Sequence, residues 1–108
     1  IEVISIVDKF LEHTRLFIFE NNGDPKVYIS SADFMTRNLD RRVEISCPIY
    51  DEDIKQELID TFEICWSDNV KARIVDSNLV NQKIINDKPP IRSQWATYEL
   101  FSDGKELC

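Results

Sequence analysis

Apolar residues cluster in short runs over the first third of the chain, and these runs predict β-strands. Residues 15–20 are aromatic and β-branched, and residues 26–31 form a second run of the same kind. The polar cluster at 21–25 is typical of a turn, and Asn22-Gly23 favours positive φ. Together these segments predict a β-hairpin. Because both faces of its strands are apolar, we expect the hairpin to be central in a sheet and covered on both sides.

Further along the chain, strand-like and helix-like patterns alternate. Residues 41–47 predict a third strand that Pro48 ends, and residues 70–75 predict a fourth. The segment 32–40 between strands has no clear period. Turn residues at 76–78 and 86–90 predict loops. This order of elements predicts an α/β (α+β) fold with a mixed central sheet flanked by helices.

Two helices are predicted from apolar spacing. The first begins at the acidic run 51–53, where acids suit the positive end of the helix dipole. The second covers 93–102 and ends at Asp103-Gly104. We expect one face of each helix to pack on the sheet, with both tryptophans in the core. The face residues are Ile54, Leu58, Phe62, Cys65 and Trp66 in the first helix, and Trp95, Tyr98, Leu100 and Phe101 in the second.

Length and composition restrict the class of protein. The 108 residues, of which 43% are hydrophobic and 31% charged, suit one globular domain spanning 1–108. The net charge of −7 excludes a wholly basic nucleic-acid binder, so an anionic partner must meet a local group of bases. No apolar run is long enough to span a membrane, and no signal peptide is visible. Because the chain starts at Ile1, we interpret it as a piece of a longer protein.

The cysteines indicate a reducing compartment. Cys47, Cys65 and Cys108 are an odd number, lie far apart and form no CxxC pair. This spacing favours neither a disulfide framework nor a zinc site, and we expect no metal ligand set within this chain. We therefore expect a cytoplasmic location, with peripheral attachment to a membrane left open.

The single histidine is the first candidate for chemistry. His13 precedes the first hairpin strand, and Arg15 projects to the same side of an extended chain. Imidazole can transfer a proton near neutral pH or attack phosphorus, and a guanidinium can neutralise the phosphate oxygens. A surface histidine at the start of a strand is the simpler alternative, and this pair alone favours that alternative.

A second candidate group lies between the second and third predicted strands. Three arginines, Arg37, Arg41 and Arg42, fall within six positions and can form a local anion site. Nearby acids can orient these arginines or merely neutralise them in a solvated loop. Ser30 and Ser31 can bind phosphate or act as ordinary turn caps. The acids are Asp33, Asp40 and Glu44.

The two groups together resemble a degenerate half-site of the phospholipase D superfamily. That pattern is His-x-Lys-x4-Asp, then Gly-Ser-x-Asn, then a downstream Glu. The matching positions here are His13, Arg15, Glu20, Ser30-Ser31, Asp33 and Glu44. Arginine replaces lysine, glutamate replaces the first aspartate, and aspartate replaces asparagine. These departures argue against a plain phosphodiesterase.

Longer stretches resemble the C-terminal domain of the long, multidomain polyphosphate kinase family. The resemblance covers nearly the whole chain and is least distinctive after about residue 77. It rests on Phe10-Leu-Glu-His-Thr-Arg15, Phe19-Glu-Asn-Asn-Gly-Asp24, Tyr28-Ile-Ser-Ser-Ala-Asp-Phe-Met-Thr-Arg-Asn38 and Ser67-Asp-Asn-Val-Lys-Ala-Arg73. The resemblance implies a phospholipase D-like domain in an enzyme that reversibly moves the terminal phosphate of ATP onto polyphosphate, with Mg²⁺. It also implies further domains of the same polypeptide as partners and a homo-oligomer.

The resemblance implies roles for particular residues. The phosphorylated histidine of the family belongs to the preceding domain, which this chain lacks. His13 matches a second family histidine beside the nucleotide phosphates, and Arg42 matches an arginine that faces them. Arg15 and Ser31 as phosphate contacts, and Asp33 and Glu44 as supports, follow from the superfamily pattern only. The alternatives are a phospholipase D-like phosphodiesterase or nuclease half and a non-catalytic interaction domain.

Overall fold

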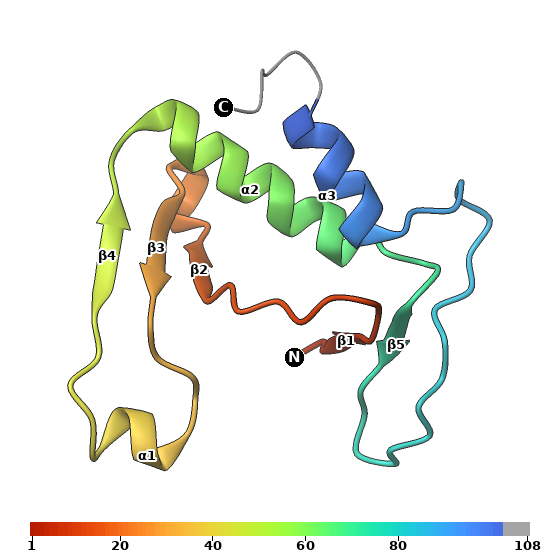
Figure 1. The fold of residues 1–108 in the computed structure, drawn as a ribbon, viewed down its shortest axis with the longest axis horizontal. Coiled ribbons are helices and arrows are strands. Elements are labelled where there is room, and N and C mark those ends of the chain that lie inside the picture. The colour runs from red at the N-terminus through yellow and green to blue at the C-terminus, as the bar shows by residue number, and fades with distance from the viewer. Residues whose placement is uncertain (103–108) are drawn as a thin grey trace. The chain divides into compact units, whose positions relative to one another are not determined.

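A computed structural model of the chain describes residues 1–102, which belong to two compact units (Figure 1). One unit joins residues 1–11 to the described residues from Asp60 onward, and the other is Glu12–Ile59. The predicted α/β class is confirmed. The described strands, however, form two separate antiparallel sheets instead of one mixed central sheet, because the first strand pairs with the last one and not with the hairpin. That 1–108 acts as one domain stays a prediction.

The second unit contains the predicted hairpin. β2 (Leu16–Phe19) and β3 (Lys26–Ser30) pair antiparallel, and β4 (Ser46–Ile49) pairs with the other side of β3. The strand order is β2-β3-β4, so β2 lies at an edge of this sheet. The expectation of a central hairpin covered on both faces is wrong, since Phe19 is 56% exposed and Ile29 is 42% exposed.

Three consecutive residues with positive φ reverse the chain between β2 and β3. Asn21, Asn22 and Gly23 have φ values of 49°, 54° and 88°. Glycine and asparagine adopt this left-handed region at the least cost, which explains the sequence of the turn. The Glu20 carboxylate accepts from the N–H groups of Asn22 and Gly23 at 2.8 and 2.7 Å. The turn prediction is confirmed.

The connection from β3 to β4 differs from the prediction. The third strand begins at Ser46 instead of residue 41, and it continues through Pro48, which lies opposite Tyr28. An edge strand tolerates proline because one side of its backbone needs no strand partner. The segment without a clear period contains α1 (Thr36–Leu39), a helix of one turn, which is too short to show one.

α2 (Glu52–Trp66) begins where the acidic run predicts it. Asp51 Oδ1 accepts from the N–H groups of Asp53 and Ile54, both at 3.0 Å, and so caps the helix. Its predicted apolar face is only partly buried, because Ile54 is 50% exposed. Lys55, at 7% exposure, is buried instead and pairs with Glu52.

The first unit is built on a two-stranded sheet. β1 (Ile4–Ile6) pairs antiparallel with β5 (Ala72–Ile74), which confirms the predicted fourth strand. An isolated bridge adds Lys83 opposite Arg73. Since side chains alternate across a sheet, one face carries the isoleucines of β1 together with Ala72 and Ile74. Ser5, Arg73 and Lys83 project from the other face.

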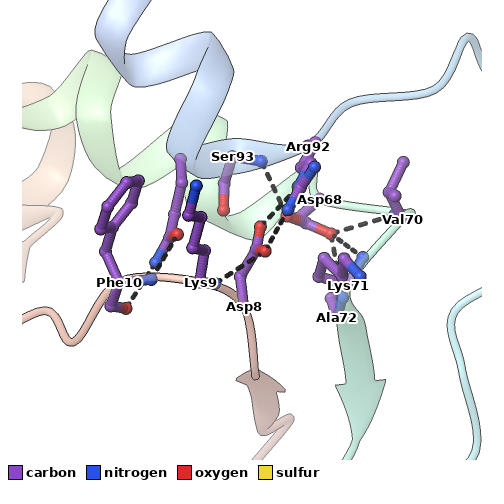
Figure 2. Close-up of polar contacts among 10 residues, drawn as sticks. Asp8, Lys9, Phe10, Asp68, Val70, Lys71, Ala72, Arg92 and Ser93 are labelled. Carbon is purple, nitrogen blue, oxygen red and sulfur yellow. Dashed lines mark hydrogen bonds and ion pairs between the residues drawn. The ribbon is translucent and has the colours of Figure 1, made fainter.

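α3 (Ser93–Ser102) has the predicted bounds, and polar contacts at its start fix residues 8–10. Arg92 donates to both oxygens of Asp8, at 2.8 and 2.6 Å. The Gln94 amide accepts from the N–H of Phe10 at 3.0 Å and donates to its carbonyl at 2.7 Å. Figure 2 shows the Asp8–Arg92 pair beside the buried Asp68. We call the Asp8–Arg92 and Phe10–Gln94 contacts the polar clasp.

Asp68 connects three segments of the first unit (Figure 2). Its Oδ1 accepts from the backbone N–H groups of Val70, Lys71 and Ala72 at 3.0, 2.7 and 2.9 Å. Its Oδ2 accepts from the N–H of Ser93 at 2.7 Å, at the start of α3. The side chain is 1% exposed. A single carboxylate thus joins the end of α2, the start of β5 and the start of α3.

The apolar side chains are less buried than the sequence predicts. Among residues 1–102 the fully buried apolar residues are Val27 in one unit and Ala72 in the other. Trp66 and Trp95 are 39% and 41% exposed, so the prediction that they fill a core is wrong. Phe62 stacks on Trp66, with ring centroids 6.1 Å apart.

The remaining predictions concern loops and the end of the chain. The turn at 76–78 is confirmed by the N–H of Asn78, which donates to Asp76 at 3.1 Å, and 86–90 is a loop as predicted. The predicted helix end at Asp103-Gly104 lies outside the described residues. None of the helices in residues 1–102 combines the length and apolar character that crossing a membrane requires.

Candidate functional site

The candidate residues gather at one end of the three-stranded sheet. Antiparallel pairing places the starts of β2 and β4 beside the end of β3. The N–H of Ser30 donates to the carbonyl of Arg15 at 2.9 Å, and the N–H of Ser31 donates to the carbonyl of Ile45 at 3.0 Å. Residues far apart in sequence therefore meet at this end of the sheet. We call it the histidine end, because His13 leads into it.

Arg15 and Asp33 form the centre of the histidine end. Arg15 Nε lies 2.8 Å from Asp33 Oδ1, and Nη2 lies 3.4 Å from Oδ2. Arg15 Nη1 donates to the carbonyl of His13 at 3.2 Å. The hydrogen bond from Arg15 lowers the pKa of the Asp33 carboxyl, and the charges of Arg37 and His13 lower it further. The guanidinium thus holds the backbone of His13 and the carboxylate in one arrangement.

Ser31 and Glu44 form the second pair. The Ser31 hydroxyl donates to Glu44 Oε2 and accepts from the N–H of Ile45 at 3.0 Å. The Glu44 charge also raises the pKa of Arg15, after the larger effect of the Asp33 contact. Both acids predicted as supports therefore interact with the same guanidinium. The neighbouring Ser30 hydroxyl bonds to Ser46 Oγ and to the N–H of Ala32.

His13 and Arg42 are exposed members of the predicted set, and their side chains have no recorded partner within residues 1–102. The His13 side chain lies at the start of β2, and within residues 1–102 its ring makes no hydrogen bond or ion pair. Arg42 follows α1 in the loop that leads to β4, and within the same residues its guanidinium is likewise unpaired. The structure brings His13, Arg15, Asp33, Ser31 and Glu44 to the histidine end by contact or charge, and records no contact of Arg42 with them.

One residue of the superfamily pattern lies elsewhere. Glu20 follows β2 at the end opposite to Arg15, where it caps the turn before β3. Four strand residues separate the two positions, so Glu20 does not join the histidine end. The position that matches the superfamily aspartate therefore caps a turn and is not part of the histidine end.

Asn38 was not predicted as a site residue from the sequence. It lies in α1 at 5% exposure, and its Nδ2 has no hydrogen-bond partner among the described residues. A buried donor without a partner costs about 1–3 kcal/mol, so such a group is unusual. Its position one residue after Arg37, within the long matching stretch that ends at Asn38, is the signal that sequence offered.

The side chains of the histidine end also determine which kind of ion it suits. In residues 1–102 no three His, Cys, Asp or Glu side chains are close enough together to hold one. Asp33 is occupied by Arg15 and Glu44 by Ser31. The histidine end therefore offers cationic and hydrogen-bonding groups, which suit an oxyanion better than a cation.

Taken together, the fold and the histidine end define an α/β chain with a site suited to phosphate groups. The profile of the family described as "Polyphosphate kinase C-terminal domain 2" matches residues 1–94. The chain belongs to this family, and the structural similarity below agrees with the predicted phospholipase D-like fold.

Relatives support the same assignment. The chain is 50% identical over 102 residues to the polyphosphate kinase of Klebsiella pneumoniae and 49% identical to that of Escherichia coli K12, covering 94% of this chain in each case. The crystal structure of the Porphyromonas gingivalis polyphosphate kinase matches with a TM-score of 0.89 and 44% identity over 93% of this chain. The chain spans 15% of the length of the two relatives and 16% of that solved chain.

Proposed function

We propose that the protein containing this chain is a polyphosphate kinase and that the histidine end contributes phosphate contacts to its active site. The enzyme reversibly transfers the terminal phosphate of ATP to inorganic polyphosphate and releases ADP. The phosphate passes through a histidine in the preceding domain, outside this chain. The supporting observation is the meeting of His13, Arg15 and their paired acids at one end of the sheet.

The chemistry of phosphoryl transfer suits these residues. Transfer depends on positioning and on neutralising the charge of the phosphate oxygens. His13 binds a phosphate oxygen or exchanges a proton with the leaving group, because its exposed ring is unpaired within residues 1–102. Arg42 supplies a two-point hydrogen bond to phosphate. Mg²⁺, held mainly by other domains, neutralises further phosphate charge when it is bound.

Arg15 has both an internal and an external role in this proposal. Three of its N–H groups donate to Asp33 and His13. A guanidinium has five N–H groups, so two remain for a phosphate oxygen. Asp33 and Glu44 keep the guanidinium in place by hydrogen bonding and by charge. Ser31 binds phosphate only by turning its hydroxyl away from Glu44, which makes it the weaker contact.

The family assignment also supports proposals about the setting of the enzyme. We propose that the other domains of the same polypeptide complete the site, and that the enzyme assembles as a homo-oligomer. It acts in the cytoplasm, either free or attached peripherally to a membrane, and takes no nucleic acid as partner.

The test is polyphosphate synthesis from ATP and Mg²⁺ by the full-length protein and its His13→Ala variant. Loss of general acid–base help or of a phosphate contact is expected to lower the rate by roughly 10²- to 10⁴-fold. Thr14→Ala, an exposed neighbour, is the matched control and is expected to retain synthesis. Matching circular dichroism spectra show that each variant is folded.

Covalent phosphate on the protein separates the roles of the two histidines. A His13→Ala protein that still carries phosphate but synthesises slowly supports the proposal, because the nucleophile then lies elsewhere. A normal synthesis rate in this variant would remove His13 from the mechanism. A wild-type protein that makes no polyphosphate would refute the proposed function. Hydrolysis of a model phosphodiester would instead support the phosphodiesterase alternative.

One observation favours the alternative of an interaction domain. Trp66, Ile74 and Ile84 line an apolar groove of about 460 Å³ together with residues 1–4. Exposed apolar surface of this kind marks contact with other protein surfaces. The chain spans 15% of the length of its relatives, so contact between this groove and other domains is also expected within a polyphosphate kinase. If the His13→Ala and Arg42→Ala variants both synthesise polyphosphate at the wild-type rate, the role of an interaction domain would be favoured.

A further inference from the structure

The sheet of the first unit carries a basic cavity that the proposed function does not use. The cavity measures about 280 Å³ and is lined by Val7, Val70, Lys71, Arg73, Asn81 and Lys83. Three of these six residues are cationic and none is acidic. This balance is unusual in a chain with 20 acids and 13 bases. We call these residues the basic cavity.

The pairing of strands brings two of the three cations together, and the third lines the same cavity. Arg73 and Lys83 lie directly opposite each other in an antiparallel bridge. Directly opposed residues project from the same face, and like charges in that position repel. Lys71 lies in the bend just before β5, and its side chain lines the same cavity as Arg73. The sequence therefore maintains a repulsive arrangement that a bound anion would relieve.

The acids of the chain leave these cations unneutralised. Within residues 1–102 Lys71, Arg73 and Lys83 form no ion pair with a carboxylate. The charge of Lys71 contributes to the lowered pKa of Asp8, but both oxygens of Asp8 already accept hydrogen bonds from Arg92. Asp68 contacts Lys71 through its backbone N–H and not through its ammonium group. Apart from one N–H of Arg73 that donates to Asn81, the ammonium and guanidinium donors are therefore available to a ligand.

Arg73 is held in place by the opposite wall of the cavity. Its Nη1 donates to the carbonyl of Asn81 at 3.0 Å. Asn81 has a positive φ of 58°, which turns the 79–83 loop back toward β5. The N–H of Ile74 donates to the carbonyl of Gln82 at 2.8 Å, and the N–H of Ile84 donates to that of Ala72 at 3.1 Å. The cations thus lie on a hydrogen-bonded strand arrangement and not on an open loop.

We propose that the basic cavity binds a short run of phosphate groups from a condensed phosphate chain, as a site separate from the residues of the histidine end. Its volume is just below the range of about 300–1,000 Å³ typical for small-molecule pockets, so it suits a few phosphate groups better than a whole nucleotide. Three cations offer several charge-assisted hydrogen bonds to the oxygens of neighbouring phosphates. The choice of condensed phosphate rests on the proposed function.

The test measures the chemical reactivity of individual lysines in the full-length protein. Amines are acetylated with and without tripolyphosphate, and each lysine is quantified by mass spectrometry. Saturating tripolyphosphate is expected to slow the labelling of Lys71 and Lys83 by about tenfold. Lys9 and Lys88, which lie outside the basic cavity in the same unit, serve as internal controls and are expected to label at an unchanged rate.

Two further ligands identify the source of the phosphate. Orthophosphate and ATP at the same concentration are expected to protect Lys71 and Lys83 less than tripolyphosphate does. Equal protection by orthophosphate or by ATP would overturn the assignment to a condensed chain. Equal protection of all four lysines by tripolyphosphate would show general screening, and absence of protection would show no binding. Both results would overturn the proposal.

An arginine variant tests the geometry. Arg73→Gln is expected to abolish the protection of Lys71 and Lys83, whereas Arg73→Lys keeps the charge and retains part of it. Unchanged hydrogen exchange at Ala72 shows that β5 is intact in each variant. Protection that survives in a folded Arg73→Gln protein would contradict the proposal. Polyphosphate synthesis by the wild-type protein is measured separately. Synthesis without protection of Lys71 and Lys83 overturns only this inference. Protection of these lysines without synthesis overturns only the proposed function.

Discussion

Arg15 and Asp33 are eighteen positions apart in the sequence, yet Arg15 Nε lies 2.8 Å from Asp33 Oδ1. The pairing of β2 with β3 brings them together, because Arg15 precedes one strand and Asp33 follows the other. Arg15 also donates to the carbonyl of His13 at 3.2 Å. A change at Asp33 is therefore transmitted to the backbone that carries the histidine.

Asp33→Asn is expected to lower polyphosphate synthesis by about tenfold, because an amide offers Arg15 one acceptor oxygen instead of two. The measurement is the steady-state rate with full-length protein. Asp24→Asn is the matched control, since Asp24 pairs with Lys26 at 3.0 Å near the turn at the other end of β2. Equal losses in the two variants would contradict a positioning role for Asp33.

The Arg15–Asp33 pair also predicts how the stability of the fold depends on pH. Arg15 lowers the pKa of Asp33 below its ordinary value of 3.8. A carboxyl with a depressed pKa stabilises the fold above its unfolded pKa, and this contribution is lost as the pH falls through the folded value. Acid unfolding of the Asp33→Asn protein, followed by circular dichroism, is therefore expected to depend less on pH below about pH 4. Superimposable acid profiles would contradict this linkage.

Arg42→Ala is expected to raise the KM for ATP or polyphosphate by roughly 10- to 100-fold, the cost of losing a charged hydrogen bond to phosphate. Arg42→Lys is expected to recover only part of the loss, because lysine lacks the two-point geometry. Saturation curves of the full-length variants measure both effects. Lys26→Ala removes a base whose partner is Asp24 and is the control. Unchanged saturation in Arg42→Ala would refute the assignment.

Asp68→Ala is expected to weaken the first unit. Asp68 accepts hydrogen bonds from two buried N–H groups, those of Ala72 and Ser93. Each buried donor left without a partner costs about 1–3 kcal/mol. The expected loss of local stability is therefore on the order of 2–6 kcal/mol. Hydrogen exchange at Ala72 and Ser93 measures it within the full-length protein. Asp76→Ala, which removes an exposed turn cap, is expected to leave exchange at both positions unchanged.

The Asp68 substitution also has a graded form. In an Asp68→Asn protein the remaining side-chain oxygen can still accept from the three N–H groups of residues 70–72. The amide nitrogen then lies opposite the N–H of Ser93, and two donors cannot form a hydrogen bond. Exchange is therefore expected to rise more at Ser93 than at Ala72. Burial raises the pKa of Asp68, but hydrogen bonds from Ser93, Lys71 and Ala72 outweigh it and lower the pKa overall. Equal exchange changes at the two amides would contradict this division between the oxygens.

The polar clasp is expected to open in acid. The Arg92 contact lowers the pKa of Asp8 below 3.8, so the clasp persists above that pH and weakens as the pH falls through the depressed value. In an Asp8→Asn protein the N–H of Phe10 is expected to exchange severalfold faster at neutral pH. Asp76→Asn is the matched control. Unchanged exchange at Phe10 would show that Gln94 alone holds this segment.

The sequence predicted local elements better than their packing. The hairpin, the Asp51 cap and the bounds of α3 depend on turn chemistry, capping and periodicity within a few residues. The pairing of β1 with β5 could not be predicted, because nearly seventy residues separate them and no local pattern encodes the partner. The exposure of Trp66 was missed because a helical apolar face does not reveal what covers it.

The candidate site was predicted in part. The histidine, the arginine and both supporting acids meet as the superfamily pattern suggested, because that pattern reflects strand ends that lie side by side. The place of Glu20 at the far end of β2 did not follow from the pattern, since spacing alone does not distinguish the two ends of a strand of four residues. The role of Asp68 could not be predicted from the sequence. An aspartate that accepts four backbone N–H groups in the folded chain has the same local sequence context as an ordinary turn residue.

The alternation of faces in the β1–β5 sheet restricts how the chain can change in length. A shift of one residue would exchange the face of Ile74 with that of Arg73 and move charge into the apolar side. Asp68 fixes the phase, because its carboxylate holds the backbone up to Ala72. One extra residue between Asp68 and Ala72 would therefore turn the strand over, whereas the 76–81 loop can lengthen without inverting either face.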